Sequence, residues 1–207
     1  MTILKVRLTF EEDILGMSPN SKQVYTDYIA DKSPDAATIE EEVAAVGVDQ
    51  VTENAMTVFP RENGAPFMYD YQVKGFFKDA CGMLARVTGK DENGKKKTAA
   101  NESSKLKAFK KVIDGLIFVY PRKILFNFDG EIGNLQRPLR AQTAQGERIA
   151  LANSETISAK ATLEFEIKCL SDELVAVVKE WLDYGALRGM GQWRNAGYGR
   201  FRWEEIS

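Results

Sequence analysis

Apolar and polar residues alternate strictly along two stretches of this 207-residue chain, residues 2–10 and 161–169. A period of two places the apolar side chains on one face of a strand and the polar side chains on the other. The predicted inward residues are Leu4, Val6, Leu8 and Phe10 in the first stretch, and Leu163, Phe165, Ile167 and Cys169 in the second. Both stretches are therefore predicted to be strands of a half-buried sheet, and the open face of the first carries Lys5 and Arg7.

Two other stretches, residues 71–87 and 171–185, have the 3.6-residue period of amphipathic helices. The predicted buried stripes are Val73, Phe77, Ala80, Cys81 and Leu84 in the first, and Leu174, Val177, Val178, Trp181 and Leu182 in the second. Ser171 is expected to cap the second helix, and Gly185 is expected to end it.

The remaining segments are predicted from shorter patterns. Strands are expected at residues 55–60, 116–120, 124–128 and 199–206, and a polar, projecting hairpin at residues 136–158. Ser18 and Pro19 have the pattern of a helix start. They are expected to open a helix toward Ile29, followed by a second short helix that ends near Val46, so that residues 11–54 form an acidic helical insertion. Residues 88–105 are expected to be a mobile, lysine-rich loop.

This order of elements predicts an α+β fold with a ferredoxin-like, RRM-like core: an antiparallel sheet with two helices on one face. Residues 1–207 are expected to form a single domain. The other face of such a sheet stays open, which is how RNA-binding sheets of this type work.

The amino-acid composition excludes several classes of active site and metal site. The chain contains no histidine, which excludes Ser-His and Cys-His mechanisms and most zinc sites. Its two cysteines, Cys81 and Cys169, lie in apolar settings, and the first residues alternate like a strand rather than forming a signal peptide. No apolar run approaches the roughly 18 residues of a membrane span. We therefore expect a protein of the reducing cytoplasm.

The net charge of −2 hides a strong asymmetry. From Glu11 to Glu53 there are eleven acidic residues against two lysines, and from Arg86 to Lys123 eleven basic residues against four acidic ones. The basic half is suited to track phosphates. The acidic half is suited to contact a basic neighbour, including another copy of the chain.

Residues 189–201, Gly-Met-Gly-Gln-Trp-Arg-Asn-Ala-Gly-Tyr-Gly-Arg-Phe, contain four glycines, two arginines and three aromatic residues. Glycines let the backbone turn tightly or let a ligand approach closely, and free N–H groups beside arginines suit phosphate. The alternative is a flexible connector between the preceding helix and the last strand.

Three separated pieces resemble the RAMP superfamily, in particular the backbone (guide-RNA-binding) subunits of type III and related CRISPR effector complexes. The first piece is 57–75, where a strand and a proline-containing turn lead into Val73-Lys74-Gly75. The second is 137–167, a basic segment followed by a small-residue turn into a strand, and the third is Gly197-Tyr198-Gly199-Arg200 before the last strand.

The resemblance implies a ferredoxin-like core, a thumb-like hairpin at 136–158, and guide RNA bound along a basic face in a multi-copy filament. Copies of the chain or other effector-complex subunits are the implied protein partners, and no cofactor or metal is implied. The expected RNA-binding residues, with those of the open sheet face included, are Lys5, Arg7, Lys74, Arg137, Arg140, Arg148, Arg188, Gly191, Trp193, Arg194, Gly197, Tyr198, Gly199 and Arg200. Trp193 and Tyr198 are expected either to stack on RNA or to plug the core.

Cleaving members of this family carry an Asp where the present chain has Asn54, with Glu53 adjacent. Asn lacks the anionic oxygen that metal-assisted phosphodiester cleavage prefers. Asp27, Asp31 and Asp35 have i, i+4 spacing, which fits either a divalent-ion site or a solvated helix face. We therefore expect a non-catalytic RNA-binding protein. The alternatives are a protein-interaction module, such as a phage-encoded mimic or inhibitor of a CRISPR complex, and an endoribonuclease that uses Glu53.

Overall fold

The computed structural model describes residues 1–20, 56–90, 96–98, 101–143 and 146–207. The chain divides into two compact units. The first contains residues 1–14, 61–129 and 158–207, and the second contains residues 15–60 and 130–157.

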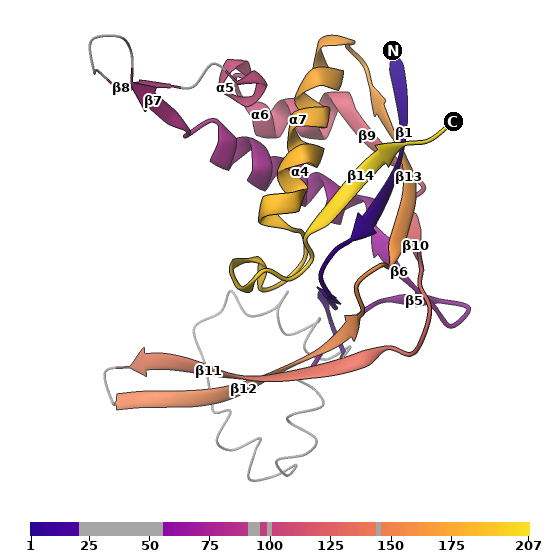
Figure 1. Ribbon diagram of the computed structural model, residues 1–207, viewed down its shortest axis with the longest axis vertical. Helices are drawn as coiled ribbons and strands as arrows, with labels where there is room; N and C mark the ends of the chain where they lie inside the picture. Colours follow the sequence, from indigo (N-terminus) through magenta and orange to yellow (C-terminus); the bar gives the residue numbers. More distant parts are fainter. Residues whose placement is uncertain (21–55, 91–95, 99–100, 144–145) are drawn as a thin grey trace. The chain divides into compact units, whose positions relative to one another are not determined.

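An antiparallel sheet forms the first unit's core (Figure 1). Among the described residues it has seven strands, namely β1 (Thr2–Phe10), β5 (Arg61–Glu62), β6 (Ala65–Tyr69), β9 (Ile117–Tyr120), β10 (Lys123–Asn127), β13 (Thr162–Cys169) and β14 (Phe201–Glu205). Their order is β14-β1-β13-β10-β6-β5, and β9 also pairs with β13. Because β1 lies between β13 and β14, two β-α-β units interlock, which confirms the predicted α+β, ferredoxin-like fold.

The predicted inward faces of β1 and β13 are confirmed. The two strands pair so that Leu4 lies opposite Ile167 and Leu8 opposite Leu163. All eight predicted inward residues are buried. Alternation in sequence therefore fixed which face of the sheet receives the helices.

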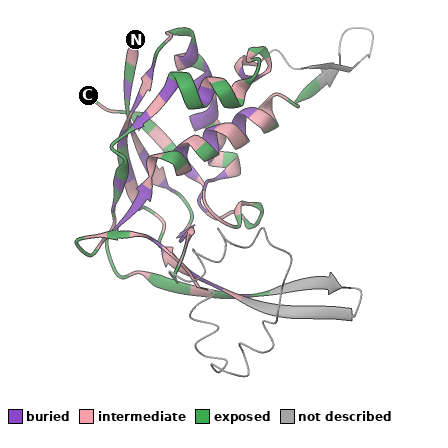
Figure 2. Ribbon diagram, turned by 180° about the vertical axis from the view of Figure 1, so that it is seen from behind, coloured by how far each residue is buried: buried purple, intermediate pink, exposed green. Residues whose placement is uncertain are grey.

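Helices cover one face of this sheet (Figures 1 and 2). Those in the described part of the unit are α4 (Asp70–Leu84), α5 (Glu102–Lys105), α6 (Phe109–Leu116) and α7 (Glu173–Arg188). α4 and α7 are the two predicted amphipathic helices, and they pack through Phe77 and Trp181, whose ring centroids are 5.4 Å apart. α6 was not predicted, although Phe109, Ile113 and Leu116 have helical spacing.

The predicted end of the last helix is wrong. α7 continues through Gly185 to Arg188, and Gly189 takes the left-handed φ of 70° that ends it. Gly185 is instead a packing position. A Cβ there would lie 2.1 Å from the ring of Phe201, which is itself fully buried. This glycine is therefore explained by the close approach of α7 and β14 and not by the end of the helix.

The lysine-rich segment 88–105 is not a loop throughout. It contains the paired strands β7 (Thr88–Lys90) and β8 (Lys96–Thr98), followed by α5. The carboxylate of Glu180 on α7 accepts hydrogen bonds from the backbone N–H groups of Glu102 and Ser103, both at 2.9 Å. Trp181 donates from Nε1 to the Ser103 hydroxyl. Local composition cannot reveal these partners, because they come from a helix about 78 residues later.

The second unit is built on a long hairpin of β11 (Gly133–Thr143) and β12 (Gly146–Ile157), which confirms the predicted hairpin and extends its first strand. Its sheet also contains β2 (Ile14–Leu15), β3 (Ser18–Pro19) and β4 (Thr57–Val58). The helix start at Ser18 and Pro19 is therefore wrong, since both pair with β4 as an edge strand, where proline is tolerated. The helices expected toward Ile29 and Val46 lie outside the described residues.

Both cysteines are buried in the first unit and form no disulfide. Burial raises the pKa of the Cys81 thiol to about 11, and likewise that of Cys169 to about 11. Both are inert structural thiols at neutral pH. None of the helices in the described residues combines the length and apolar character needed to cross a bilayer.

Substitution of two helix glycines, Gly185 and Gly75, is expected to have opposite effects on stability. Gly185→Ala is expected to lower the free energy of unfolding by about 1–3 kcal/mol, since the buried Phe201 ring has no room to move. Gly75→Ala on α4 meets no atom within 4 Å and is expected to raise it by about 0.5–1 kcal/mol. Urea unfolding of both variants measures this, and equal effects would contradict the packing role of Gly185.

The cysteines provide a second test. At pH 8 the native chain is expected to react with a thiol reagent far more slowly than the chain unfolded in guanidinium, because burial disfavours both thiolates. Rapid labelling of either cysteine in the native chain would contradict their burial.

Candidate nucleic-acid interface

Residues 189–200, here called the glycine loop, connect α7 to β14 and include a short 3₁₀ turn, η1 (Arg194–Ala196). The backbone has a positive φ at Gly189, Gly191, Trp193, Gly197 and Gly199. At four of these five positions the residue is glycine, which adopts such angles without strain. The loop therefore has a defined path rather than that of an extended connector.

Two of the glycines let the two limbs of the loop contact each other. Met190 donates its backbone N–H to the carbonyl of Gly199 at 2.9 Å. A Cβ on Gly199 would lie 2.0 Å from the carbonyl oxygen of Met190, and one on Gly189 would lie 2.5 Å from the carbonyl oxygen of Tyr198. Close approach is required here, as the glycine cluster predicts, but the approaching group is the loop's own backbone.

A carboxylate from α4 holds the first limb. Asp79 Oδ2 accepts from Arg188 Nε at 2.9 Å and from Arg194 Nη1 at 2.7 Å. The three side chains are only 21–27% exposed. The hydrogen bond to Asp79 raises the pKa of Arg188 above its ordinary value. No sequence pattern around Asp79 marks it as a partner of this loop, because the arginines that it contacts lie more than 100 residues later in the chain.

The residues after β1 hold the second limb. Arg200 donates from Nη2 to Glu12 at 3.0 Å and from Nε to the carbonyl of Gly197 at 3.2 Å. Gly199 donates its backbone N–H to the carbonyl of Asp13 at 2.8 Å. The first acidic residues of the expected insertion therefore fix the base of the loop.

A cavity of about 330 Å³ opens at the glycine loop, lined by Arg188, Gly191, Gln192, Trp193, Arg194 and Asn195. Its lining is polar, apart from Trp193 and Gly191. Arg188 donates from Nη1 to Asn195 Oδ1 at 2.8 Å. Trp193 stacks against Tyr198, with ring centroids 5.2 Å apart and planes at 8°. Trp193 remains 39% exposed, so it does not plug the core.

The open face of the sheet presents paired charges. Arg7 contacts Glu164 at 2.7 Å and Glu204 at 3.0 Å, one on each neighbouring strand. The hydrogen bond to Glu164 is the main cause that raises the pKa of Arg7. Lys168 lies 3.8 Å from Glu166 and over the ring of Tyr120. Ion pairs across and along the strands therefore neutralise much of the positive charge that the sequence places on this face.

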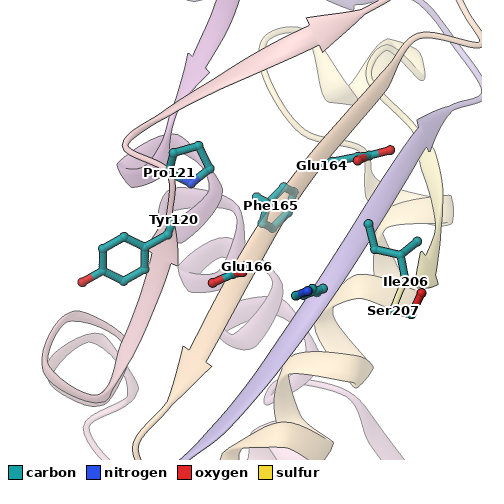
Figure 3. A pocket seen from close by; sticks show the side chains of 8 residues that line it. Tyr120, Pro121, Glu164, Phe165, Glu166, Ile206 and Ser207 are labelled. Atoms are coloured by element: carbon teal, nitrogen blue, oxygen red, sulfur yellow. The ribbon is translucent and has the colours of Figure 1, made fainter.

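Lys5 lines a cavity of about 550 Å³ on the same face, together with Tyr120, Pro121, Glu164, Phe165, Glu166, Ile206 and Ser207. Figure 3 shows Tyr120 and Pro121 on one side, the glutamates along β13, and Ile206 and Ser207 on the other. The cavity thus carries both signs of charge.

Lys74 lies within α4, away from the glycine loop's residues in sequence. Its Nζ donates to the backbone carbonyl of Asp114 at 3.2 Å and lies 5.1 Å from the Phe118 ring centroid. Burial is the main cause that lowers the pKa of Lys74. The Lys-Gly motif is therefore part of the helix layer, not of its first capping residues.

The remaining predicted arginines lie on the hairpin of the second unit. Arg137 is 9% exposed and pairs across the hairpin with Ala152, while Arg140 pairs with Ile149 and Arg148 with Ala141. At the base of the hairpin, Glu155 accepts a hydrogen bond from the backbone N–H of Phe59 at 2.8 Å. Glu53 and Asn54, on which the cleavage hypothesis depends, lie outside the described residues.

The structure thus brings eight of the fourteen predicted residues together in the glycine loop and at its edge, namely Arg188, Gly191, Trp193, Arg194, Gly197, Tyr198, Gly199 and Arg200. Lys5 and Arg7 lie on the open sheet face, and Lys74 lies in the helix layer. No feature of the sequence identified Asp79 and Glu12 as partners of these arginines.

Substitution separates a glycine that is needed for both its positive φ and close packing, Gly199, from one that is needed only for its positive φ, Gly64. Gly199→Ala is expected to lower the free energy of unfolding by about 2–4 kcal/mol, since backbone strain adds to a clash with Met190. Gly64→Ala, in the turn before β6, has a φ of 85° but open space around its Cβ, and is expected to cost only about 1 kcal/mol. Equal costs in urea unfolding would show that the loop limbs do not pack as described.

No protein-family model matches the sequence, and no curated protein sequence matches it. Solved structures do match. A chain from a structure of type III-B Cmr-beta bound to cognate target RNA is 12% identical, with a TM-score of 0.50 over 100% of this chain. A type IV-B CRISPR complex chain gives 12% identity and a TM-score of 0.47, covering 100% of this chain and 91% of its own. Cmr6 from Pyrococcus furiosus gives 11% and 0.48, covering 97% of both chains.

The present chain spans only 59% of the Cmr-beta chain that it matches. At this identity the match establishes the fold and leaves the activity open. The chain therefore shares its fold with a chain of the type III-B Cmr-beta structure.

Proposed function

We propose that this protein is a non-catalytic, RNA-binding subunit of a CRISPR effector complex that holds guide RNA by its phosphate backbone. One observation carries the proposal: a polar cavity at the glycine loop is lined by Arg188 and Arg194, on a fold shared with a chain of a Cmr-beta structure bound to target RNA. Arginines held in place suit phosphate, because their planar forks meet its oxygens with little loss of side-chain entropy.

The glycine loop is the primary contact in this proposal. Its arginines bind phosphate and 2′-hydroxyl groups, and the Trp193–Tyr198 pair offers a surface on which a base or ribose stacks. The hairpin of β11 and β12 acts as the thumb, with Arg137, Arg140 and Arg148 along it. Such contacts track the backbone and read little sequence.

Other copies of the chain or other effector subunits are the proposed protein partners, in the cytoplasm. The acidic segment 11–53 of one copy and the basic segment 86–123 of the next supply complementary charge. Cleavage is not part of the proposed function. If Glu53 replaces the Asp of cleaving relatives, guide-complementary RNA incubated with Mg²⁺ would show regularly spaced cuts, and a Glu53→Gln variant would not produce them.

The paired charges of the open sheet face favour a second candidate, a protein-interaction module without RNA. A face on which Arg7 is held between Glu164 and Glu204 attracts phosphate weakly and suits a protein surface of mixed charge. The absorbance ratio at 260 and 280 nm of the purified protein, with and without nuclease, separates the two candidates. A nuclease-sensitive excess at 260 nm supports RNA binding.

The main proposal predicts a strong salt dependence. Affinity for an RNA of about 30 nucleotides is expected to fall by at least about tenfold between 50 and 200 mM salt, because bound phosphates release counterions. Filter binding or fluorescence anisotropy measures it. Affinity that does not change with salt would contradict phosphate tracking.

Two variants, one that removes two arginines of the glycine loop and one that removes three lysines elsewhere, show which segment contacts RNA. Arg194→Ala with Arg200→Ala is expected to weaken RNA binding by about tenfold or more, since each arginine forms charge-assisted hydrogen bonds. The matched control, Lys95→Ala with Lys96→Ala and Lys97→Ala, removes more charge and is expected to weaken it less. Equal losses, or a larger loss in the control, would move the site to the lysine-rich segment.

A further inference from the structure

The cluster of Asp79, Arg188 and Arg194 brings two like charges to one carboxylate oxygen. Two guanidinium groups repel each other at this separation, and one carboxylate neutralises only one of them. The cluster therefore keeps a net charge of about +1 at the mouth of the loop cavity, where the side chains are about a quarter exposed. An anion from outside completes such a cluster.

The two arginines differ in how their donors are used. Arg188 gives Nε and Nη2 to Asp79, at 2.9 and 3.5 Å, and Nη1 to Asn195 at 2.8 Å. Arg194 gives only Nη1 to Asp79, so its Nε and Nη2 have no hydrogen-bond acceptor among the residues that the structure describes. All three guanidinium nitrogens of Arg188 thus donate within the protein, whereas Arg194 keeps Nε and Nη2, an edge of the guanidinium that can donate to phosphate oxygens.

We propose that Asp79 is a positioning residue. Its carboxylate, which is also bound by Arg188, holds the Arg194 side chain in place so that Arg194 contacts an RNA phosphate. This inference rests on the proposed function and adds a residue and a division of roles within the loop. A carboxylate beside an RNA site repels phosphate over a distance, so its presence there needs a compensating effect. Fixing Arg194 before RNA arrives supplies that effect, since a preordered side chain loses less entropy on binding.

Asp79 could act on RNA as a repelling negative charge or as the residue that positions Arg194, and these two roles predict opposite changes in RNA affinity when its charge is removed. Asp79→Asn keeps the size of the side chain and removes its charge. If Asp79 acted only as a nearby negative charge, this change would tighten RNA binding. If it positions Arg194, the change weakens binding, by about fivefold or more, and lowers the slope of log affinity against log salt by about one phosphate contact. The matched control is Glu205→Gln, which also removes one negative charge and one ion pair, with Lys179, and is expected to leave affinity unchanged or slightly raised.

Coupling tests whether Asp79 acts through the arginines. In a chain that carries Arg188→Ala and Arg194→Ala, the further change Asp79→Asn is expected to cause no additional loss of RNA affinity. Arg194→Ala alone is expected to lower the salt slope as Asp79→Asn does. An equal loss from Asp79→Asn in both backgrounds would overturn the proposed route through the arginines.

A readout without RNA separates this inference from the proposed function. In Asp79→Asn, backbone hydrogen exchange over residues 189–199 is expected to become faster, while exchange in β1 and β13 and the midpoint of urea unfolding stay unchanged. Unchanged exchange together with equal or tighter RNA binding would overturn the inference. If the unaltered chain binds no RNA but the exchange result holds, the proposed function fails. The contact between Asp79 and Arg194 then only orders the loop, and its proposed role in RNA binding is overturned.

Discussion

The packing of Phe201 against Gly185 is the contact on which the rest of the first unit depends. It brings β14 against α7 at a distance that only glycine allows. The same ring lies 5.3 Å from Phe76 on α4 and 6.1 Å from Phe10 at the end of β1, measured between centroids. One buried side chain thus joins both core helices to both strands, and it directly follows the glycine loop. The loop's second limb therefore begins from a fixed point.

The elements of the core follow from their sequence periods because each of them buries one face. β1 and β13 alternate, and α4 and α7 have apolar stripes, so the interlocked sheet with helices on one face follows from the order of the elements alone. The failures have a common cause in partners distant in sequence. Glu180 orders the segment that its lysines mark as a loop, Phe201 explains a glycine that looks like a helix end, and β4 pairs with residues that look like a helix start.

The candidate site was predicted only in its composition. The loop's arginines, glycines and aromatic residues are visible in the sequence as a cluster, and the structure keeps eight predicted residues together there. Their partners are not visible, because Asp79 stands on a helix and Glu12 follows the first strand. A count of arginines treats each as free to meet a phosphate, whereas ion pairs within the protein decide how many donors each retains.

The positive surfaces of the first unit differ in how far carboxylates of the protein neutralise their arginines. Arg7 is held between two glutamates on an exposed strand, where an RNA phosphate must compete with both carboxylates for the same guanidinium. Arg188 and Arg194 share one carboxylate, so the pair retains positive charge without needing to break an existing contact. A phosphate gains more where the protein leaves charge unneutralised than where charge is merely abundant. On the sheet face a phosphate therefore meets charge that is already neutralised, whereas the cluster of Arg188, Arg194 and Asp79 at the glycine loop retains positive charge.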